Sequence, residues 1–270
     1  MPLKKHIAKA TQTTLNRFGY QLKRLNRNFD KILSDLFKKL PTPLTSAVIF
    51  DVGANNGSSI ERFQRVFKSL RIQPLIYSFE PNKGLFQDLK SKYLQSSNVF
   101  LYQKGVGSEA GALEFFEHTT SHGSSSFLPV EQNTRFAQRR GIAQDTVRCY
   151  EVPIVTIDGV FSEFKLEKIN LLKIDVQGFE EDVLKGCSQL LSKQLIDIIE
   201  VEVVVAPVYS KRITFFDIEK NLVNYGYRLV ALSNDGRYFN LMPFDIFENP
   251  ELQFDLIYVS PRIFNEVVTL

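Results

Sequence analysis

Acidic and glycine residues are combined in one short segment, Asp51-Val52-Gly53-Ala54-Asn55-Asn56-Gly57, directly after the apolar run Val48–Phe50. Glycine at 53 and 57 permits positive φ angles and lets a ligand approach the backbone closely. A helix that follows such a turn also offers free N–H groups at its first residues. The segment therefore predicts a nucleotide-type binding turn between a strand and a helix, although a plain strand-to-helix turn is an alternative.

The pattern of this turn separates two classes of cofactor. The dinucleotide fingerprint G-x-G-x-x-G binds pyrophosphate at the helix N-terminus. Here the form is D-x-G-x-x-x-G, and Asp51 in first place suits a ligand that carries an ammonium group. The methionine part of S-adenosylmethionine carries both an amine and a sulfonium. We therefore expect Asp51, Gly53, Asn55 and Gly57 to contact that cofactor.

Two further turns follow apolar runs and complete a nucleoside pocket. Phe79-Glu80-Pro81 ends the second run, and a carboxylate at this place can accept both hydroxyls of a ribose while Pro81 turns the chain away. An acid near a helix N-terminus is also common for electrostatic reasons alone. Gly105-Val106-Gly107-Ser108 ends the third run, and its small residues let an adenine ring lie on the backbone with Val106 as an apolar wall.

Charged residues stand on two strands that we expect to be central. Alternation places Lys173 and Asp175 on one face of the run 170–176, and it places Glu200 and Glu202 together on the run 195–205. Buried charges need partners, so Lys173 is expected to neutralise one of the two glutamates. Such a network is either purely structural or leads to a ligand edge, where Asp175 would orient or deprotonate a hydroxyl.

A hydroxyl-rich loop, residues 119–126, lies between the predicted elements and contains His122. A histidine can act as a base near neutral pH, although a loop histidine is more often only solvated. His122 and Glu202 are therefore reserve candidates for the base, after Asp175. A divalent metal bridging Asp175 and Glu202 is an alternative, but the ligand spacing does not require one and we expect none.

Short apolar runs alternate with helical stretches from residue 47 onward, which predicts a doubly wound, mostly parallel α/β sheet with helices on both faces. Such sheets bind ligands beyond the carboxyl ends of their strands, which is where the residues above stand. We expect seven core strands, at 48–50, 75–79, 99–102, 170–176, 195–205, 227–232 and 256–259, with further strands at 113–116 and 147–155. The expected helices are 58–70, 83–94, 180–191 and 215–225.

A basic helix precedes this body. Residues 1–40 contain ten Lys or Arg and two acids, whereas the whole chain of 270 residues has a net charge of only +3. Apolar residues from Phe18 to Leu40 recur every three or four positions, which predicts an amphipathic helix over 5–40. Pro41 and Pro43 then mark a boundary between an extension, 1–43, and a domain, 44–270. The helix is expected to dock on its own domain or in a homodimer, with peripheral membrane contact as the alternative.

Composition limits the compartment and the partners. Hydrophobic residues make up 44% of the chain and no run is long enough for a transmembrane helix. Two cysteines are too few for a disulfide framework, and the N-terminus has no apolar signal region. We therefore expect a cytoplasmic protein. The acidic body argues against a nucleic-acid partner.

Taken together, these motifs resemble the FkbM family of methyltransferases over roughly residues 48–205. The resemblance rests on the turn 51–57, on Phe79-Glu80-Pro81 and on the segment 171–180, where the family commonly has Glu in place of Gln177. It implies a seven-stranded Rossmann-like methyltransferase sheet and O-methylation, often of a sugar hydroxyl in a glycolipid, polysaccharide or glycosylated metabolite. It also implies Glu80 on the ribose of S-adenosylmethionine and the turn 51–57 around its methionine moiety.

Two other functions are compatible with such a sheet. A nicotinamide-dependent oxidoreductase would need G-x-G-x-x-G after the first strand, which the turn 51–57 does not match. A non-catalytic glycan- or membrane-associated protein that kept the fold would be expected to have lost the cofactor turn. The acceptor itself is not indicated by these motifs.

Overall fold

The computed structural model describes residues 29–40, 44–134, 137–138, 141–204, 208–211, 213–233 and 253–268. Its main sheet has seven strands in the order β3-β2-β1-β7-β8-β10-β9. The neighbours from β3 to β8 are parallel, and β10 runs antiparallel to β8 and β9. The strands are β1 Ser46–Val52, β2 Gln73–Phe79, β3 Val99–Tyr102, β7 Ile169–Ile174, β8 Ile196–Val204, β9 Arg228–Ser233 and β10 Gln253–Val259. The predicted doubly wound, mostly parallel sheet is confirmed.

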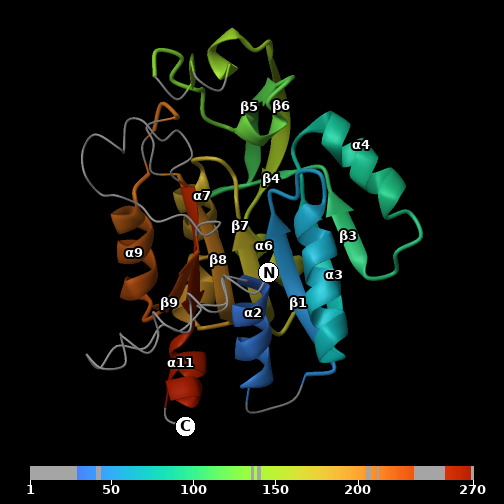
Figure 1. The fold of residues 1–270 in the computed structure, drawn as a ribbon, viewed down its shortest axis with the longest axis vertical. Coiled ribbons are helices and arrows are strands. Elements are labelled where there is room, and N and C mark those ends of the chain that lie inside the picture. The colour runs from blue at the N-terminus through green and yellow to red at the C-terminus, as the bar shows by residue number, and fades with distance from the viewer. Residues whose placement is uncertain are drawn as a thin grey trace, which may run out of the picture.

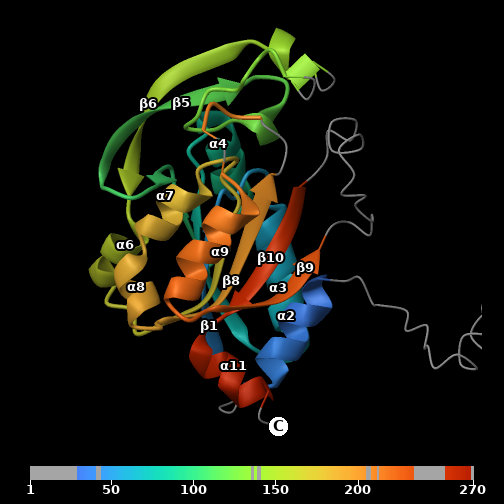
Figure 2. The same ribbon diagram turned by 90° about the vertical axis from the view of Figure 1, so that its left-hand side faces the viewer.

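Helices cover both faces of this sheet (Figures 1 and 2). One layer contains α2 Phe29–Lys38, α3 Ser58–Leu70, α4 Lys83–Lys92 and α11 Pro261–Val268. The opposite layer contains α6 Ile157–Glu163, α7 Glu180–Lys185, α8 Ser188–Ser192 and α9 Phe215–Asn224. A hydrophobic cluster lies between the sheet and each layer.

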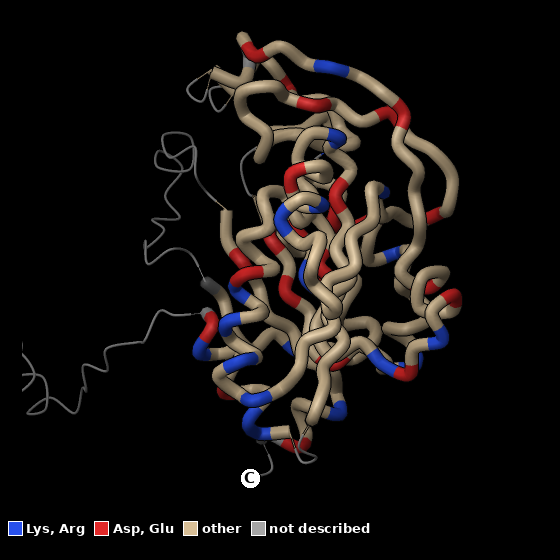
Figure 3. The backbone as a smooth tube through the Cα atoms, turned by 90° about the vertical axis from the view of Figure 1, so that its right-hand side faces the viewer, with Lys and Arg blue, Asp and Glu red and all other residues tan. Residues whose placement is uncertain are grey.

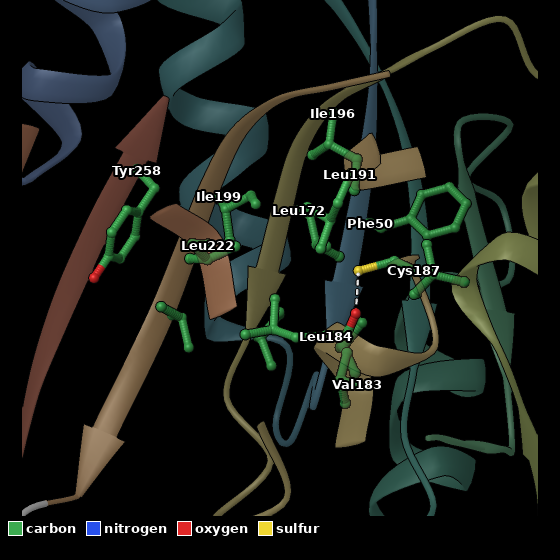
Figure 4. Close-up of a cluster of buried hydrophobic side chains, with 14 of the residues drawn as sticks. Phe50, Leu172, Val183, Leu184, Cys187, Leu191, Ile196, Ile199, Leu222 and Tyr258 are labelled. Carbon is green, nitrogen blue, oxygen red and sulfur yellow. Dashed lines mark hydrogen bonds between the residues drawn. The ribbon is translucent and has the colours of Figure 1, made fainter. Parts of the chain in front are cut away.

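The central strand β7 is buried along its whole length, as its sequence Ile-Asn-Leu-Leu-Lys-Ile predicts for a parallel strand covered on both faces. Its apolar side chains alternate between the two clusters, with Leu171 on the α3 side and Leu172 on the α7 side. Figure 4 shows Leu172 packed with side chains from α7 and α8, where Cys187 Sγ donates to the Leu184 carbonyl. The sheet is therefore a rigid base from which the ends of its strands project.

A second, three-stranded sheet lies beyond the carboxyl ends of the main strands (Figure 2). We call it the cap sheet, and it consists of β4 Gly105–Val106, β6 Val147–Val155 and β5 Gly111–His118. The loop 119–126, here the cap loop, leaves β5 and includes the short 3-10 helix His122–Ser124. A second such turn, Ile142–Gln144, precedes β6.

Most elements match their prediction within a few residues, and three differences have physical causes. The predicted helix 180–191 is broken into α7 and α8 at Gly186, where the Gly107 carbonyl fills the space of a side chain. The turn 105–108 begins with strand β4, because β6 pairs with it. The short helices α6 and α11 were not predicted, although Thr156 caps α6 through Gly159 N as a threonine at that place often does.

The N-terminal extension is described only from residue 29. Its helix α2 docks on α3, where Leu33 is fully buried and the Phe37 ring meets Phe67 edge-on at 4.7 Å. Asp30 forms ion pairs with Arg62 and Arg65 of α3. Docking on the same domain is therefore observed for α2, whereas the predicted helix over 5–28 lies outside the described residues. The boundary at residue 43 stays a prediction.

The distribution of charged residues and the length of the apolar helices describe the surface of the protein. Acidic and basic positions lie close to one another over much of the backbone (Figure 3). None of the helices in the described ranges is long and apolar enough to cross a membrane.

Gly186→Ala is expected to destabilise the fold through a steric clash. A Cβ at this position would lie 2.0 Å from the Gly107 carbonyl oxygen, and neither backbone segment can give way easily. We expect a loss of about 2 kcal/mol or more in the free energy of unfolding, measured from the midpoint of urea denaturation. Gly111→Ala is the matched control, because a Cβ there meets nothing within 4 Å. Equal midpoints for the two variants would contradict the packing described here.

Candidate active site

A cavity of about 420 Å³ lies between the cap sheet and the carboxyl ends of β1, β2, β7 and β8. This volume is within the range of small-molecule sites, roughly 300–1,000 Å³. Eight of the predicted site residues line it, and they are Gly53, Asn55, Glu80, Pro81, Val106, His122, Asp175 and Glu202. Further walls come from Phe79, Lys104, Phe115, Phe127, Gln177 and Gln253. The structure therefore brings together side chains from eight separate regions of the sequence.

Asp51 lies behind the cavity rather than in it. Its side chain is fully buried, and it accepts hydrogen bonds from the hydroxyls of Ser59 at 2.7 Å and Ser78 at 3.3 Å. Lys173 Nζ lies 3.5 Å from its other oxygen. Since β1 alternates, Asp51 points into the α3 layer, so it does not line the cavity, and its contact with the ammonium group of a ligand stays a prediction.

Gly57 also lies away from the cavity. It precedes α3 with a φ of 84°, and a Cβ there would lie 2.7 Å from Leu89 of α4. Its role is therefore the close packing of α3 and α4. Gly53, also at φ 84°, faces the ligand edge, and a Cβ on it would lie 1.9 Å from the Asp175 carbonyl oxygen. Only glycine fits between β1 and β7 at this point.

Glu80 is held firmly at the edge of the cavity. Its side-chain oxygens accept hydrogen bonds from the backbone N–H groups of Asn55 at 2.7 Å and Asn82 at 2.8 Å. These contacts tie the end of β2 to the turn after β1. Burial raises the pKa of Glu80 to about 7 despite these two hydrogen bonds. The lone pairs that remain on its oxygens can accept hydroxyls of a ligand.

The expected pairing of Lys173 with a glutamate is wrong, although the strands are neighbours as supposed. Lys173 Nζ donates to the Gly53 carbonyl at 2.7 Å and lies 3.2 Å from Asp175. Glu200, its neighbour across the sheet, is instead paired with Arg62 of α3 at 2.6 Å. Burial alone would lower the pKa of Lys173, but the Asp175 and Asp51 carboxylates raise it, so this lysine is a permanent cation.

Asp175 and Glu202 form a carboxyl pair at the floor of the cavity. Gln177 Nε2 bridges them, donating to Asp175 Oδ1 at 3.0 Å and to Glu202 Oε2 at 2.6 Å. Burial, reinforced by the neighbouring Asp175 carboxylate, raises the pKa of Glu202 well above its usual range. Burial also opposes ionisation of Asp175, but Lys173 and Gln177 lower its pKa below the usual value. These opposite shifts favour the proton on Glu202 and the negative charge on Asp175.

The cap loop covers this floor and brings His122 to the cavity. Asp145 anchors the loop by accepting from the backbone N–H of Thr120 at 3.2 Å and of Ser121 at 3.0 Å. Although its burial opposes ionisation, hydrogen bonds from the loop hold the pKa of Asp145 at about 2. His122 itself is exposed on its outer side. It reaches the ligand space but makes none of the contacts that join Asp175 to Glu202.

Three contributors to the site were not predicted as such. Gln177 was noted only as a departure from a motif, although its place two residues after Asp175 was a usable signal. Tyr209, which donates to Gln177 Oε1 at 3.0 Å, follows β8 in a segment without a recognisable motif. Lys104 precedes Gly105 and lines the cavity, but a lone lysine in a turn carries no specific signal. Within the described residues, no group of three or more His, Cys, Asp or Glu side chains is arranged to hold a metal ion.

Comparison with known sequences gives one family and several relatives. The model of the methyltransferase FkbM domain matches residues 51–229. The chain is 25% identical over 195 residues to the 2-O-methyltransferase NoeI of Sinorhizobium fredii, covering 71% of this chain and 76% of NoeI. It is 27% identical over 180 residues to the methyltransferase sdnD of Sordaria araneosa, covering 60% of this chain and 68% of sdnD.

Comparison with solved structures supports the same fold. The crystal structure of methyltransferase FkbM from Methylobacillus flagellatus superposes on 83% of this chain with a TM-score of 0.50 and 13% sequence identity. The matched region spans 48% of that longer chain. At this identity the likeness concerns the fold of the domain.

Glu180, directly behind the carboxyl pair, is expected to make stability depend on pH. Burial raises its pKa to about 7 from an ordinary 4.5, so the folded state binds more protons than the unfolded state between these values. Stability is therefore lost as pH rises from about 4.5 to 7. Glu180→Gln keeps an oxygen for the Val176 and Gly178 N–H groups and removes the charge.

Urea denaturation of Glu180→Gln at pH 5 and pH 8 measures this effect. From pH 5 to pH 8, we expect the free energy of unfolding of the variant to rise by roughly 2 kcal/mol relative to that of the unsubstituted protein. Glu109→Gln, at an exposed glutamate, is the matched control and should show no such gain. If the free energy of unfolding of the variant differed from that of the unsubstituted protein by the same amount at both pH values, the pKa of Glu180 would not be raised in the folded state.

Proposed function

The chain belongs to the FkbM family of methyltransferases and is a methyltransferase, and from this membership we propose that it uses S-adenosylmethionine to methylate a hydroxyl oxygen. We propose a sugar hydroxyl of a glycan, glycolipid or glycosylated metabolite as the acceptor. The observation that carries the proposal is the carboxyl pair of Asp175 and Glu202, bridged by Gln177 at the floor of a cavity of cofactor size.

The cavity fits S-adenosylmethionine by its chemistry. Glu80 presents a buried carboxyl whose free lone pairs suit the two ribose hydroxyls. Val106 and the aromatic rings of Phe79 and Phe115 form apolar walls for a planar base. Gly53 leaves the backbone after β1 open to the methionine part, next to the negative charge of Asp175. Direct recognition of the ammonium group by Asp51 is replaced, in this proposal, by Asp175 and backbone carbonyls.

When bound, S-adenosylmethionine supplies a methyl group on a positively charged sulfur, and this group passes to an attacking oxygen with its bonding electrons left on the sulfur. The residues of the chain must hold the acceptor hydroxyl close to that methyl and remove its proton. Positioning of two reactants accounts for much of such a rate enhancement. The cap loop and the apolar walls border the same space.

Asp175 is the base in this proposal. A sugar hydroxyl is a weak acid, so a carboxylate that accepts its proton during the transfer helps the reaction. Lys173, 3.2 Å away, keeps Asp175 ionised before the acceptor binds. Glu202, whose pKa is raised by burial, orients the hydroxyl rather than taking its proton. His122 of the cap loop lines the same cavity and stays a reserve candidate for the base.

The nature of the acceptor rests on the relatives and on the lining of the cavity. NoeI, by its name, is a 2-O-methyltransferase. The part of the cavity that faces the cap loop is rich in hydroxyls and in the polar groups of Gln177 and Gln253, which suit a ligand with several hydroxyls. Both features support a carbohydrate. The homodimer and the membrane contact proposed through residues 5–40 depend mainly on residues outside the described ranges.

Glu80→Ala is expected to weaken S-adenosylmethionine binding at least 100-fold. The substitution removes the carboxyl that accepts the ribose hydroxyls and leaves the N–H groups of Asn55 and Asn82 without their partner. Isothermal titration calorimetry with S-adenosylmethionine and with S-adenosylhomocysteine measures the loss. Glu114→Ala, at an exposed position of β5, is the control for an unrelated loss of a glutamate. Near-native affinity in Glu80→Ala would overturn the cofactor assignment.

Asp175→Asn is expected to bind S-adenosylmethionine within about threefold of the unsubstituted protein and to lose 100-fold or more in turnover, because the amide cannot accept the proton. The assay follows transfer of a labelled methyl group from S-adenosylmethionine to a panel of oligosaccharides, with the methylated position found by mass spectrometry. Unchanged turnover in Asp175→Asn would exclude this residue as the base. Methylation of proteins or nitrogen compounds in place of the sugars would contradict the proposed acceptor.

A further inference from the structure

We propose that Gln177 is a positioning residue for the carboxyl pair, and that the Tyr209 hydroxyl fixes the direction in which the Gln177 amide points. This inference rests on the proposed function, because it concerns the pair that we assign to proton removal. It adds two residues to that assignment, and one of them comes from a segment that follows β8.

The backbone at Gln177 is bent so that its side chain reaches the pair. Its φ is 57°, a left-handed conformation that residues other than glycine rarely adopt. The conformation directs the amide back over β7 and β8, where Nε2 meets an oxygen of Asp175 at 3.0 Å and of Glu202 at 2.6 Å. A strained backbone at such a contact indicates that the surrounding structure imposes it.

Tyr209 distinguishes the two ends of the Gln177 amide. A tyrosine hydroxyl can donate only one hydrogen bond, and the Tyr209 hydroxyl lies closer to Gln177 Oε1, at 3.0 Å, than to the Ser124 carbonyl, at 3.3 Å. We assign its hydrogen to the shorter contact. If the amide were reversed, its oxygen would face the carboxylate of Asp175 and its NH₂ group would face the hydroxyl. The Tyr209 hydroxyl therefore favours the orientation in which both N–H groups point at the carboxyl pair.

The Tyr209 ring is itself locked in place. A Cβ on Gly178 would lie 2.7 Å from the ring, so the ring packs directly on the glycine that follows Gln177. Gly178 has a φ of 96° and needs glycine for that reason as well. The segment 208–210 is further held by pairing of Tyr209 with Val130. The Gln177-Gly178 sequence is thus explained by one neighbour, the Tyr209 side chain.

The same contacts connect the carboxyl pair to the cap loop. Ser126 Oγ donates to the Gln177 carbonyl at 2.8 Å, and the Tyr209 hydroxyl lies 3.3 Å from the Ser124 carbonyl. Gln177 therefore occupies the junction of the floor and the cover of the cavity. A displacement of the cap loop would disturb the amide and, through it, the carboxyl pair.

The charges around Asp175 show why an amide suits this position. A glutamate at 177 would add a further carboxyl to a region already rich in acids. The charged and titratable groups that face or line this region come from all sides, and they are Lys173, Glu180, Glu202, Asp255, Glu80, Lys104 and His122. The Gln177 amide offers two N–H donors without adding charge, and thus favours the ionised form of Asp175.

The test is a titration of the carboxyl pair that needs no acceptor. Protein labelled with ¹³C at the side-chain carboxyls of Asp and Glu is titrated by NMR, and the signals are assigned with Asp175→Asn and Glu202→Gln. We expect Gln177→Ala to raise the lower apparent pKa of the pair by about one pH unit. Tyr209→Phe should raise it in the same direction by less, and Gln177→Glu should raise it at least as far as Gln177→Ala.

Turnover supplies a second readout once an oligosaccharide acceptor is in hand. In Gln177→Ala and Tyr209→Phe we expect kcat to fall about 10-fold, with the KM for S-adenosylmethionine within twofold. The acid limb of the pH profile should move upward together with the NMR titration. A fall in kcat without that movement would indicate a merely structural role and would overturn the proposal.

Tyr227→Phe is the matched control. It removes a buried hydroxyl that donates to the Ile196 carbonyl at 2.7 Å, far from the cavity, and should leave the titration of the pair unchanged. An unchanged titration in Gln177→Ala, with the protein folded, would show that the amide does not position the pair. Because the titration does not depend on methyl transfer, it decides this inference even if the proposed function fails.

Discussion

The Lys173 side chain lies inside the fold at the end of β7, and its charge has to be matched there because little of it is exposed to water. Two parts of the chain match this charge. Asp51 of β1 and the Gly53 carbonyl in the turn after β1 lie on one side, and Asp175, directly after β7, lies on the other. One cation therefore fixes the binding turn and the candidate base relative to each other. Removing Lys173 would leave two buried carboxylates without a cation. Loss of one partner of a buried ion pair is strongly destabilising, because the charge that remains is uncompensated.

The position of the ligand edge follows from this constraint. Because Lys173 draws the turn after β1 against β7, Gly53 has room for no side chain, and the backbone of Asp175 lies directly beside it. Glu80 then fixes the end of β2 by accepting the Asn55 N–H from the same turn. The three strand ends are joined by hydrogen bonds within the protein itself. A site that is organised in this way loses little free energy in ordering its own groups when a cofactor binds.

The sequence predicted the sheet and most of its site because both depend on local patterns. Apolar runs of strand length and the helical spacing of residues 58–70 do not need distant contacts to be recognised. Polar residues after parallel strands must also meet at one edge. The errors concern where side chains point and which partner they choose. Asp51 turned toward Ser59 and Ser78, and Arg62, three residues after Ser59 on α3, took the glutamate expected for Lys173. Such choices depend on the packing of α3 against the sheet, which no single segment encodes.

The cap sheet also could not be predicted in full from local sequence patterns. Its strands were expected individually, but their pairing into a separate sheet above the cavity depends on contacts between residues 29 to 43 positions apart. The cap loop closes the cavity through Asp145, Gln177 and Tyr209, three residues from three regions of the chain. Lys173 and the strand ends thus form one half of the cavity, which is rigid and is described by the family motifs. The cap sheet and the cap loop form the other half, which the motifs do not cover. In the proposed function the acceptor binds between the two halves. Its identity would then depend on the part of the chain with the least local pattern, and the chemistry on the part with the most.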